Sequence, residues 1–172
     1  MKMARQAVDS PVIVIHTLSM TLSELLEPDL ILTKAVCSSK DELINKLVER
    51  IYSSDNELPI LKNELLKTIY LRELIGGTLL PSGLSVPHAR LKNYEGFIIA
   101  MGIPAEPLFH EGVQIYLSAM MITNQSGTPL YLPSLAALTK MSKNKEYFTR
   151  LYGVNTPEEF ITIIRERDTE LT

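Results

Sequence analysis

Apolar residues recur at helical spacing in several stretches of the chain, and elsewhere they form short continuous runs. The helical pattern is clearest after Ser39, where Ser39-Lys40-Asp41-Glu42 has the order of a capping box. Apolar residues then return on one helical face: Leu43, Ile44, Leu47, Val48, Ile51 and Tyr52. A second helix is predicted from Pro59, which suits a first helical turn, to about Arg72-Glu73.

Short apolar runs predict strands at 28–35, 96–101 and 113–122. The last of these is apolar on both sides, which is typical of a buried central strand. Further helices are predicted around 132–141, over 146–152 and from Thr156, where Thr156-Pro157-Glu158-Glu159 combines a threonine cap, a first-turn proline and a capping-box glutamate. Because helices and strands interleave, the pattern favours an α/β sandwich.

The length and composition favour one globular domain. The chain has 172 residues, of which 45% are hydrophobic and 22% charged. A net charge of -3 without a basic stripe argues against nucleic acid as a partner. No apolar run is long enough for a transmembrane helix, so we expect no direct membrane insertion. The single cysteine, Cys37, excludes an intramolecular disulfide and is compatible with a reducing cytoplasm.

The most informative segment surrounds His88. Arg72-Glu73, Thr78 and the run Gly83-Leu84-Ser85-Val86-Pro87-His88 follow one another at short intervals. A neutral imidazole nitrogen can attack phosphorus, while a guanidinium and backbone N–H groups take up the charge of the phosphate oxygens. The alternative is a histidine that only completes a turn. Because Pro87 favours an extended Ser85-Val86, His88 is predicted at the end of a short extended segment.

The order and spacing of these residues resemble the active-site signature of the IIA domain of the fructose/mannitol-type phosphotransferase system (PTS). That family includes nitrogen-regulatory relatives. The resemblance runs from about Thr21 to about Arg167. It implies a mixed β-sheet flanked by helices on both faces, a three-layer sandwich, with the histidine at the sheet edge.

The resemblance also implies an activity. In that family, a histidine accepts a phosphoryl group from the phosphorylated carrier protein HPr, or from its nitrogen-branch counterpart. The histidine passes the group to a IIB domain or serves as a regulatory signal. His88 is the matching residue, which implies a cytoplasmic histidine phosphocarrier, a phosphotransferase that uses no cofactor. Sugar specificity in this system lies with the membrane component, so this chain leaves the sugar open.

Several residues around His88 are candidates for supporting roles. Arg72 is expected to stabilise the phosphate, the alternative being a solvated cation at a helix C-terminus. Candidates for phosphate binding or loop support are Thr78, Gly83, Ser85 and Arg90, with Ser85 standing where the family favours alanine. The two other histidines, His16 and His110, lack ligand-like spacing to His88, so no metal site is predicted.

Tyr131 is the main departure from the family pattern. The family often carries a second histidine in a His-Leu-x-x-Leu-Ala pattern, where this chain has Tyr131-Leu132-Pro133-Ser134-Leu135-Ala136. A phenol can donate one hydrogen bond to phosphate, but it is not cationic. Two hypotheses therefore remain: a working phosphocarrier, or a non-catalytic regulatory and interaction module with a IIA fold and weakened phosphotransfer.

Residues 1–20 precede the segment that resembles the family, and residues 21–172 are assigned to one domain. The run Pro11–Ile15 is too short for a signal-peptide core. Three explanations for 1–20 remain open: an added tail, a segment ahead of an alternative start at Met20, or an extra strand.

Overall fold

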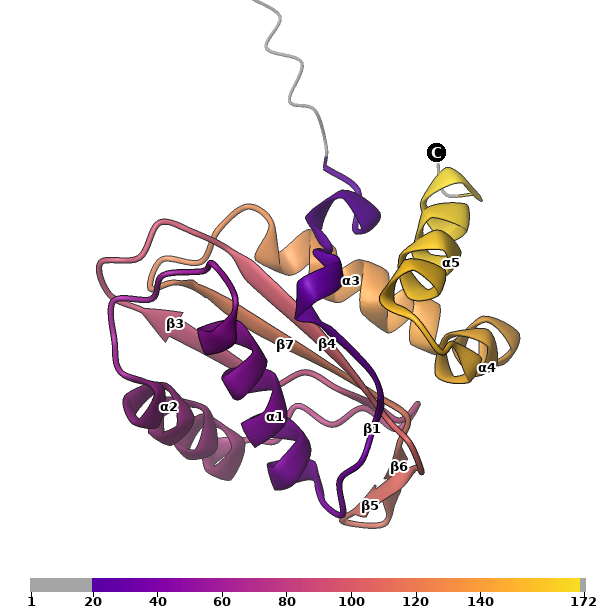
Figure 1. The fold of residues 1–172 in the computed structure, drawn as a ribbon, viewed down its shortest axis with the longest axis horizontal. Coiled ribbons are helices and arrows are strands. Elements are labelled where there is room, and N and C mark those ends of the chain that lie inside the picture. The colour runs from indigo at the N-terminus through magenta and orange to yellow at the C-terminus, as the bar shows by residue number, and fades with distance from the viewer. Residues whose placement is uncertain (1–19, 171–172) are drawn as a thin grey trace, which may run out of the picture.

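A mixed sheet lies at the centre of the computed structural model, which describes residues 20–170 (Figure 1). Its strands are β1 (Ile31–Ala35), β2 (Leu84–Ser85), β3 (His88–Leu91), β4 (Ile98–Pro104) and β7 (Leu117–Asn124). β7 pairs antiparallel with β4 and parallel with both β2 and β3, while β1 pairs parallel with β4. Apart from the sheet, β5 (Leu108–His110) and β6 (Val113–Ile115) form an antiparallel hairpin.

Helices cover both faces of the sheet. One face packs against α1 (Lys40–Ser53) and α2 (Lys62–Ile75), and the other against α3 (Tyr131–Ser142), α4 (Lys145–Gly153) and α5 (Pro157–Glu170). Two single turns of 3-10 helix, η1 (Ser23–Leu25) and η2 (Pro28–Leu30), precede β1. Alternate residues of β4 belong to the two cores, because successive side chains of a strand point to opposite faces. The predicted mixed sheet with helices on both faces is confirmed.

Side-chain caps start the helices where the sequence predicts them. Ser39 Oγ accepts a hydrogen bond from the Glu42 N–H at 3.1 Å, and α1 begins at the next residue. At α5, Thr156 Oγ1 accepts from the Glu159 N–H at 3.2 Å, and the Glu159 carboxylate accepts from the Thr156 N–H at 3.3 Å. The capping box at Thr156 is therefore confirmed in both directions. Ser39 is confirmed as the N-cap of α1, but the Glu42 carboxylate accepts from the Ser38 N–H at 2.7 Å rather than from the Ser39 N–H.

The second helix begins later than predicted. Pro59 lies in the loop ahead of α2, whose first residue is Lys62. The Leu61 N–H donates to Glu64 Oε2 at 3.1 Å, so an acidic residue in the first turn caps the helix at this point. Pro59 could occupy a first helical turn, but the helix does not begin there. The Glu64 carboxylate caps the N–H of Leu61, two residues after the proline, and α2 begins at the next residue.

The predicted strand 113–122 is two strands. It breaks at Tyr116, because Val113–Ile115 pairs with β5 while the chain from Leu117 onward pairs with β2, β3 and β4. The second part, β7, is buried through residue 123, as predicted for a central strand.

His88 begins a strand, whereas the sequence predicts it at the end of an extended segment. Pro87 separates β2 from β3, but its carbonyl oxygen accepts a hydrogen bond from the Met121 N–H at 3.0 Å. Hydrogen bonding to β7 therefore continues at Pro87. From His88 to Leu91, β3 pairs with Met121 to Asn124 of β7.

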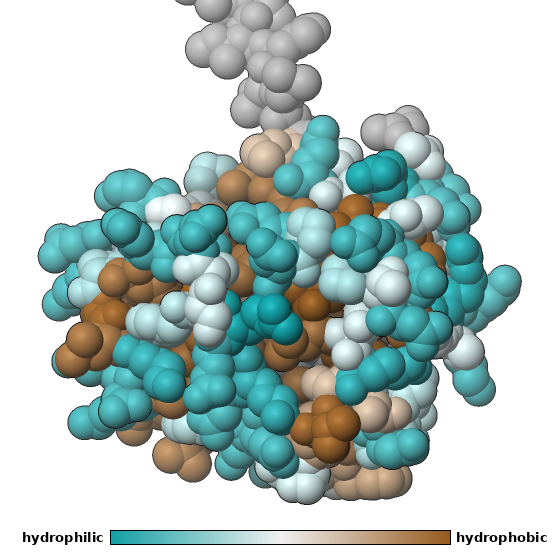
Figure 2. Space-filling model, in the orientation of Figure 1, coloured by the Kyte–Doolittle hydropathy of each residue, from teal (hydrophilic) through white to brown (hydrophobic). Residues whose placement is uncertain are grey.

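The surface that Figure 2 shows is mostly hydrophilic, with separate hydrophobic patches rather than one continuous apolar area. Within residues 20–170, no helix combines the length and the apolar character needed to cross a membrane. The predicted extension 1–20 lies outside the described residues, apart from Met20.

Candidate functional site

His88 lies on β3 at the edge of the sheet, and its side chain is 6% exposed. The ring nitrogen Nδ1 lies 3.3 Å from the Val86 carbonyl oxygen. The other ring nitrogen, Nε2, accepts a hydrogen bond from Arg72 Nε at 3.3 Å. A carbonyl can only accept and a guanidinium can only donate, so these contacts assign the proton to Nδ1 and the lone pair to Nε2.

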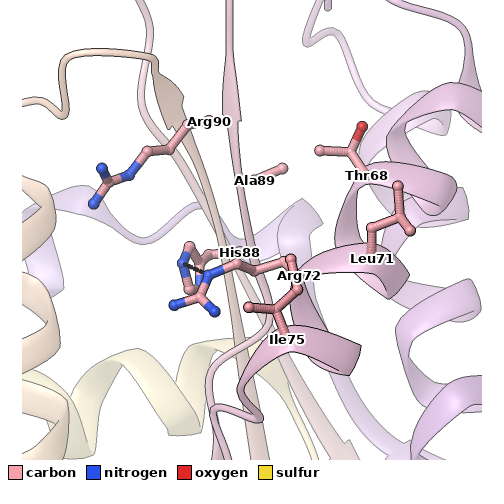
Figure 3. Close-up of a pocket in the computed structure, with 7 residues that line it drawn as sticks. All are labelled: Thr68, Leu71, Arg72, Ile75, His88, Ala89 and Arg90. Atoms are coloured by element: carbon pink, nitrogen blue, oxygen red, sulfur yellow. Dashed lines mark hydrogen bonds between the residues drawn. The ribbon is translucent and has the colours of Figure 1, made fainter.

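Arg72 reaches His88 from the last turn of α2 (Figure 3). The helix α2 lies on the opposite face of the sheet from α3. Its Nη1 also donates to the Gly76 carbonyl oxygen at 3.3 Å, and the Gly76 N–H donates to the Arg72 carbonyl oxygen at 3.3 Å. Arginine carries five N–H donors in a planar fork. The two side-chain bonds therefore leave donors for an anion that arrives beside Nε2.

A cavity of about 440 Å³ opens beside this pair of residues. Its lining comes from the last turns of α2 and from β3: Thr68, Leu71, Arg72, Ile75, His88, Ala89 and Arg90 (Figure 3). Leu71 and Ile75 are 51% and 82% exposed, so the α2 side of the opening is apolar. Sequence reasoning missed these two residues, although helical spacing was a usable signal, since Ile75 follows Arg72 by three residues and Leu71 by four.

The surroundings of His88 favour its neutral form. Burial is the main cause that lowers the pKa of His88 below its ordinary 6.5, and the positive charges of Arg72 and Arg90 lower it further. The hydrogen bond to Val86 and the negative charge of Glu73 oppose this shift. A neutral ring keeps the Nε2 lone pair available near pH 7.

Tyr131 and Arg90 complete the surroundings of His88. Tyr131 is the first residue of α3, and its ring centroid lies 5.7 Å from that of His88. The guanidinium carbon of Arg90 lies 5.7 Å from the centroid of the same phenol ring. Arg90 and His88 share one face of β3 because they are two residues apart. The structure thus brings these three candidate residues together.

Glu73 connects three segments behind the site. Its Oε1 accepts from Thr78 Oγ1 at 2.7 Å, and its Oε2 accepts from Lys40 Nζ at 2.7 Å. The Thr78 carbonyl oxygen in turn accepts from the Val86 N–H at 3.0 Å. The Thr78 hydroxyl is therefore engaged by Glu73 and does not line the cavity. Sequence reasoning missed Lys40, because a lysine in a first helical turn gives no sign of burial.

Gly83 and Ser85 lie in the core behind the site and do not line the cavity. Gly83 has φ +89, and a Cβ there would lie 2.5 Å from the Gln114 carbonyl oxygen, so the turn requires glycine. Ser85 is fully buried next to Ser118 in the β2–β7 register. Neither serine hydroxyl has a hydrogen-bond partner among the residues that the structure describes.

The remaining histidines lie elsewhere. His110 ends β5, with its Nε2 3.9 Å from a Glu111 carboxylate oxygen, and His16 is outside the described residues. In the described part of the chain, no three His, Cys, Asp or Glu side chains gather into a group that could hold a metal ion.

Comparisons with known proteins identify the family of this chain. Residues 24–167 match the family described as "Phosphoenolpyruvate-dependent sugar phosphotransferase system, EIIA 2". A relative from Escherichia coli strain K12, the "PTS system 2-O-alpha-mannosyl-D-glycerate-specific EIIABC component", is 27% identical over 158 residues. The match covers 86% of this chain but 23% of that protein, so the chain spans about a quarter of the relative's length.

Solved structures share the fold. The nitrogen regulatory protein IIA-Ntr from Neisseria meningitidis is 20% identical, with a TM-score of 0.68 over 83% of this chain and 98% of that chain. IIA mannitol from Escherichia coli is 18% identical, with a TM-score of 0.63 over 81% of this chain and 98% of that chain. The chain therefore belongs to the phosphoenolpyruvate-dependent sugar phosphotransferase system EIIA 2 family, whose members are phosphotransfer components of that system.

Proposed function

We propose that His88 is the phosphoryl acceptor of this chain and that phosphorylated HPr, or its nitrogen-branch counterpart, is the donor. The observation that carries the proposal is the pair of contacts on the imidazole ring. Val86 holds the Nδ1 proton, while Nε2 keeps its lone pair beside the Arg72 guanidinium at the edge of a cavity. Membership of the family supports this role.

In the proposed step, His88 Nε2 attacks the phosphorus of the donor phosphohistidine. A new N–P bond forms at Nε2, the N–P bond of the donor breaks, and its electron pair returns to the donor imidazole. The His88 ring gains positive charge while Nδ1 keeps its proton, so the Val86 carbonyl stabilises the product ring. Because one phosphohistidine replaces another, the step needs positioning and charge stabilisation more than chemical activation.

Arg72 is proposed to move its hydrogen bond from Nε2 to the oxygens of the incoming phosphoryl group. Charge-assisted bonds from a guanidinium fork are well suited to phosphate. Arg90, which lies over the Tyr131 ring, adds a second positive charge near the site. Thr78 and Gly83 are proposed to act indirectly, by fixing the loop that leads to His88. Ser85 is proposed to act only through the pairing of its backbone with β7, without its hydroxyl.

The recipient is proposed to be a IIB domain, with regulation of another protein as the alternative outlet. A solved Escherichia coli complex joins the enzyme IIA of the mannitol system to its phosphorylated IIB, and the IIA chain there has a TM-score of 0.63 to this chain at 17% identity. The proposed exchange would take place in the cytoplasm. Incubation of the phosphorylated chain with candidate IIB domains, followed by intact mass spectrometry of both proteins, tests this step.

The first test of the proposal is phosphorylation by the purified PTS proteins. The chain is incubated with phosphoenolpyruvate, enzyme I and HPr, and is then weighed by intact mass spectrometry. We expect one acid-labile phosphate, absent from His88→Ala and present in the control His110→Ala, which changes a half-exposed histidine of the β5–β6 hairpin. Full labelling of His88→Ala would refute the assignment.

The second candidate function is a regulatory module with a IIA fold and weakened phosphotransfer. The observation that favours it is Tyr131, an uncharged ring in contact with His88 where the family often has histidine. The variant Tyr131→His separates the two functions. A large gain in phosphorylation rate would support the regulatory module, whereas normal wild-type transfer with no gain would support the working carrier.

A further inference from the structure

A second cavity of about 430 Å³ lies away from His88, at the other end of α3. It is enclosed by the turn before β2, the start of β7, the C-terminal end of α3 and the helix α4: Ser82, Tyr116, Ser142, Lys143, Lys145, Phe148, Thr149 and Tyr152. Its volume is within the range of small-molecule sites, about 300–1,000 Å³. None of the residues proposed for phosphotransfer lines it.

Three aromatic rings form one wall of this cavity. The Tyr116 ring meets Phe148 edge-on with centroids 6.0 Å apart, and it meets Tyr152 edge-on at 5.5 Å. Tyr116 is held in place because its hydroxyl donates to Gln114 Oε1 at 2.7 Å and because Gly83 packs against its ring. The wall is therefore a fixed aromatic surface, which suits a flat apolar ligand.

Polar groups line another part of the cavity. Ser82 Oγ donates to Ser142 Oγ at 2.8 Å, and Ser142 Oγ donates to the Thr139 carbonyl oxygen at 3.0 Å. These bonds fix both hydroxyls, while the Ser82 oxygen keeps acceptor capacity for a ligand. The turn that carries Ser82 is thereby tied to the end of α3.

The charged groups in the lining are both positive. Lys143 and Lys145 are exposed at the rim, and no carboxylate lines the cavity. Neither ammonium takes part in an ion pair within residues 20–170. Around Tyr152 both signs of charge are present: burial and then the charge of Glu106 raise the pKa of Tyr152, while Lys34 Nζ lies 5.1 Å from its ring centroid. The anionic part of a ligand is therefore expected at the lysine rim, where Lys143 and Lys145 line the cavity.

We propose that this cavity binds a small organic anion with an aromatic body. The aromatic wall would contact the body of the ligand, and the two lysine ammonium groups would face its carboxylate, sulfonate or phosphate. Two of the segments that enclose the cavity, the turn with Ser82 and the helix α3, also lead to His88. Ser82 precedes it along the chain, and α3 extends from Ser142 back to Tyr131, which contacts the His88 ring.

The probe for this site is anilinonaphthalene sulfonate, an aromatic anion, titrated into the full chain and followed by two-dimensional amide NMR. We expect the largest shifts at Ser82, Tyr116 and residues 142–152. The double variant Lys143→Ala/Lys145→Ala is expected to weaken binding about tenfold, as two exposed charge contacts would. The matched control Lys67→Ala/Lys92→Ala removes two exposed lysines elsewhere and should leave the affinity unchanged.

A further variant fills the cavity. Thr149 lies exposed in the lining, so Thr149→Trp should abolish binding while the melting temperature stays close to that of the wild type. Shifts that cluster around Arg72 and His88, or equal affinities of the wild type and the double lysine variant, would overturn the proposal.

Discussion

Lys40 Nζ and Glu73 Oε2 lie 2.7 Å apart, and their side chains are only 6% and 8% exposed. The pair joins the first turn of α1 to the last turn of α2. Burying two charges costs free energy, and their attraction offsets that cost only while both are present. The pair therefore fixes the end of α2 from behind the site, and with it the position of Arg72 beside His88.

Lys40→Met is expected to lower the free energy of unfolding by about 3–5 kcal/mol, because it leaves the Glu73 carboxylate buried without its cation. Urea denaturation measures the change. The double variant Lys40→Met/Glu73→Gln should lose less free energy of unfolding than Lys40→Met alone, because it leaves no unpaired buried charge. The control Lys62→Met breaks the exposed pair with Glu49 and should cost at most about 1 kcal/mol. Equal losses of stability in Lys40→Met and Lys62→Met would contradict this account.

Arg72→Ala is expected to slow phosphorylation by phospho-HPr about a hundredfold or more, as loss of a preorganised donor to a developing charge does. Arg72→Lys should recover part of the rate, because it keeps the charge but loses the planar fork. Arg50→Ala, an exposed arginine in the last turn of α1, is the matched control and should react normally. If Arg72→Ala is also phosphorylated at the normal rate, Arg72 does not stabilise the phosphoryl group and is only a cation at the C-terminus of a helix.

The imidazole resonances of His88 are expected to titrate below pH 6.5 in an NMR experiment, because burial and two nearby guanidinium groups disfavour the charged ring. Arg72→Ala removes one of those charges and should raise the pKa of His88. The same titration in the control Arg50→Ala should follow the wild type. A His88 pKa at or above 6.5 in the wild type would contradict the described surroundings.

The lowered pKa also links His88 to stability. When the pH lies between 6.5 and the lower pKa of the folded state, the unfolded chain binds a proton on His88 while the folded chain does not. The His88 contribution to stability is therefore complete above pH 6.5 and is lost as the pH falls through this window. In urea denaturation, His88→Gln should show a weaker loss of stability across the window than the wild type shows.

Ser85→Ala is expected to raise the free energy of unfolding by about 1 kcal/mol, because it removes a fully buried hydroxyl that has no partner among the described residues. Phosphorylation should continue at the normal rate. Ser82→Ala is the informative comparison, since its hydroxyl donates to Ser142 and its loss should lower stability. A drop of similar size in both variants would show that the Ser85 hydroxyl is satisfied.

Much of the secondary structure could be predicted because it depends on neighbours in the chain. The caps at Ser39 and Thr156 bond to groups three residues away, so their sequence patterns were sufficient. The break at Tyr116 could not be predicted, because both sides of it are apolar and only the choice of partner strand differs. The start of α2 was predicted too early for a different reason: its cap is also local, but the contact from the Leu61 N–H to Glu64 decides the start rather than Pro59.

The sequence by itself determined the α/β class, because periodic burial encodes helices and strands directly. It also indicated the cluster of candidate residues around His88 and the family, through the resemblance of that segment to a known active-site signature. Only the tertiary structure decided that Arg72 contacts Nε2, that Lys40 neutralises Glu73, and that Tyr131 lies between His88 and Arg90. Each of these contacts joins different elements of secondary structure. Their formation depends on strand order and helix packing, which are collective properties of the whole core rather than of any local segment.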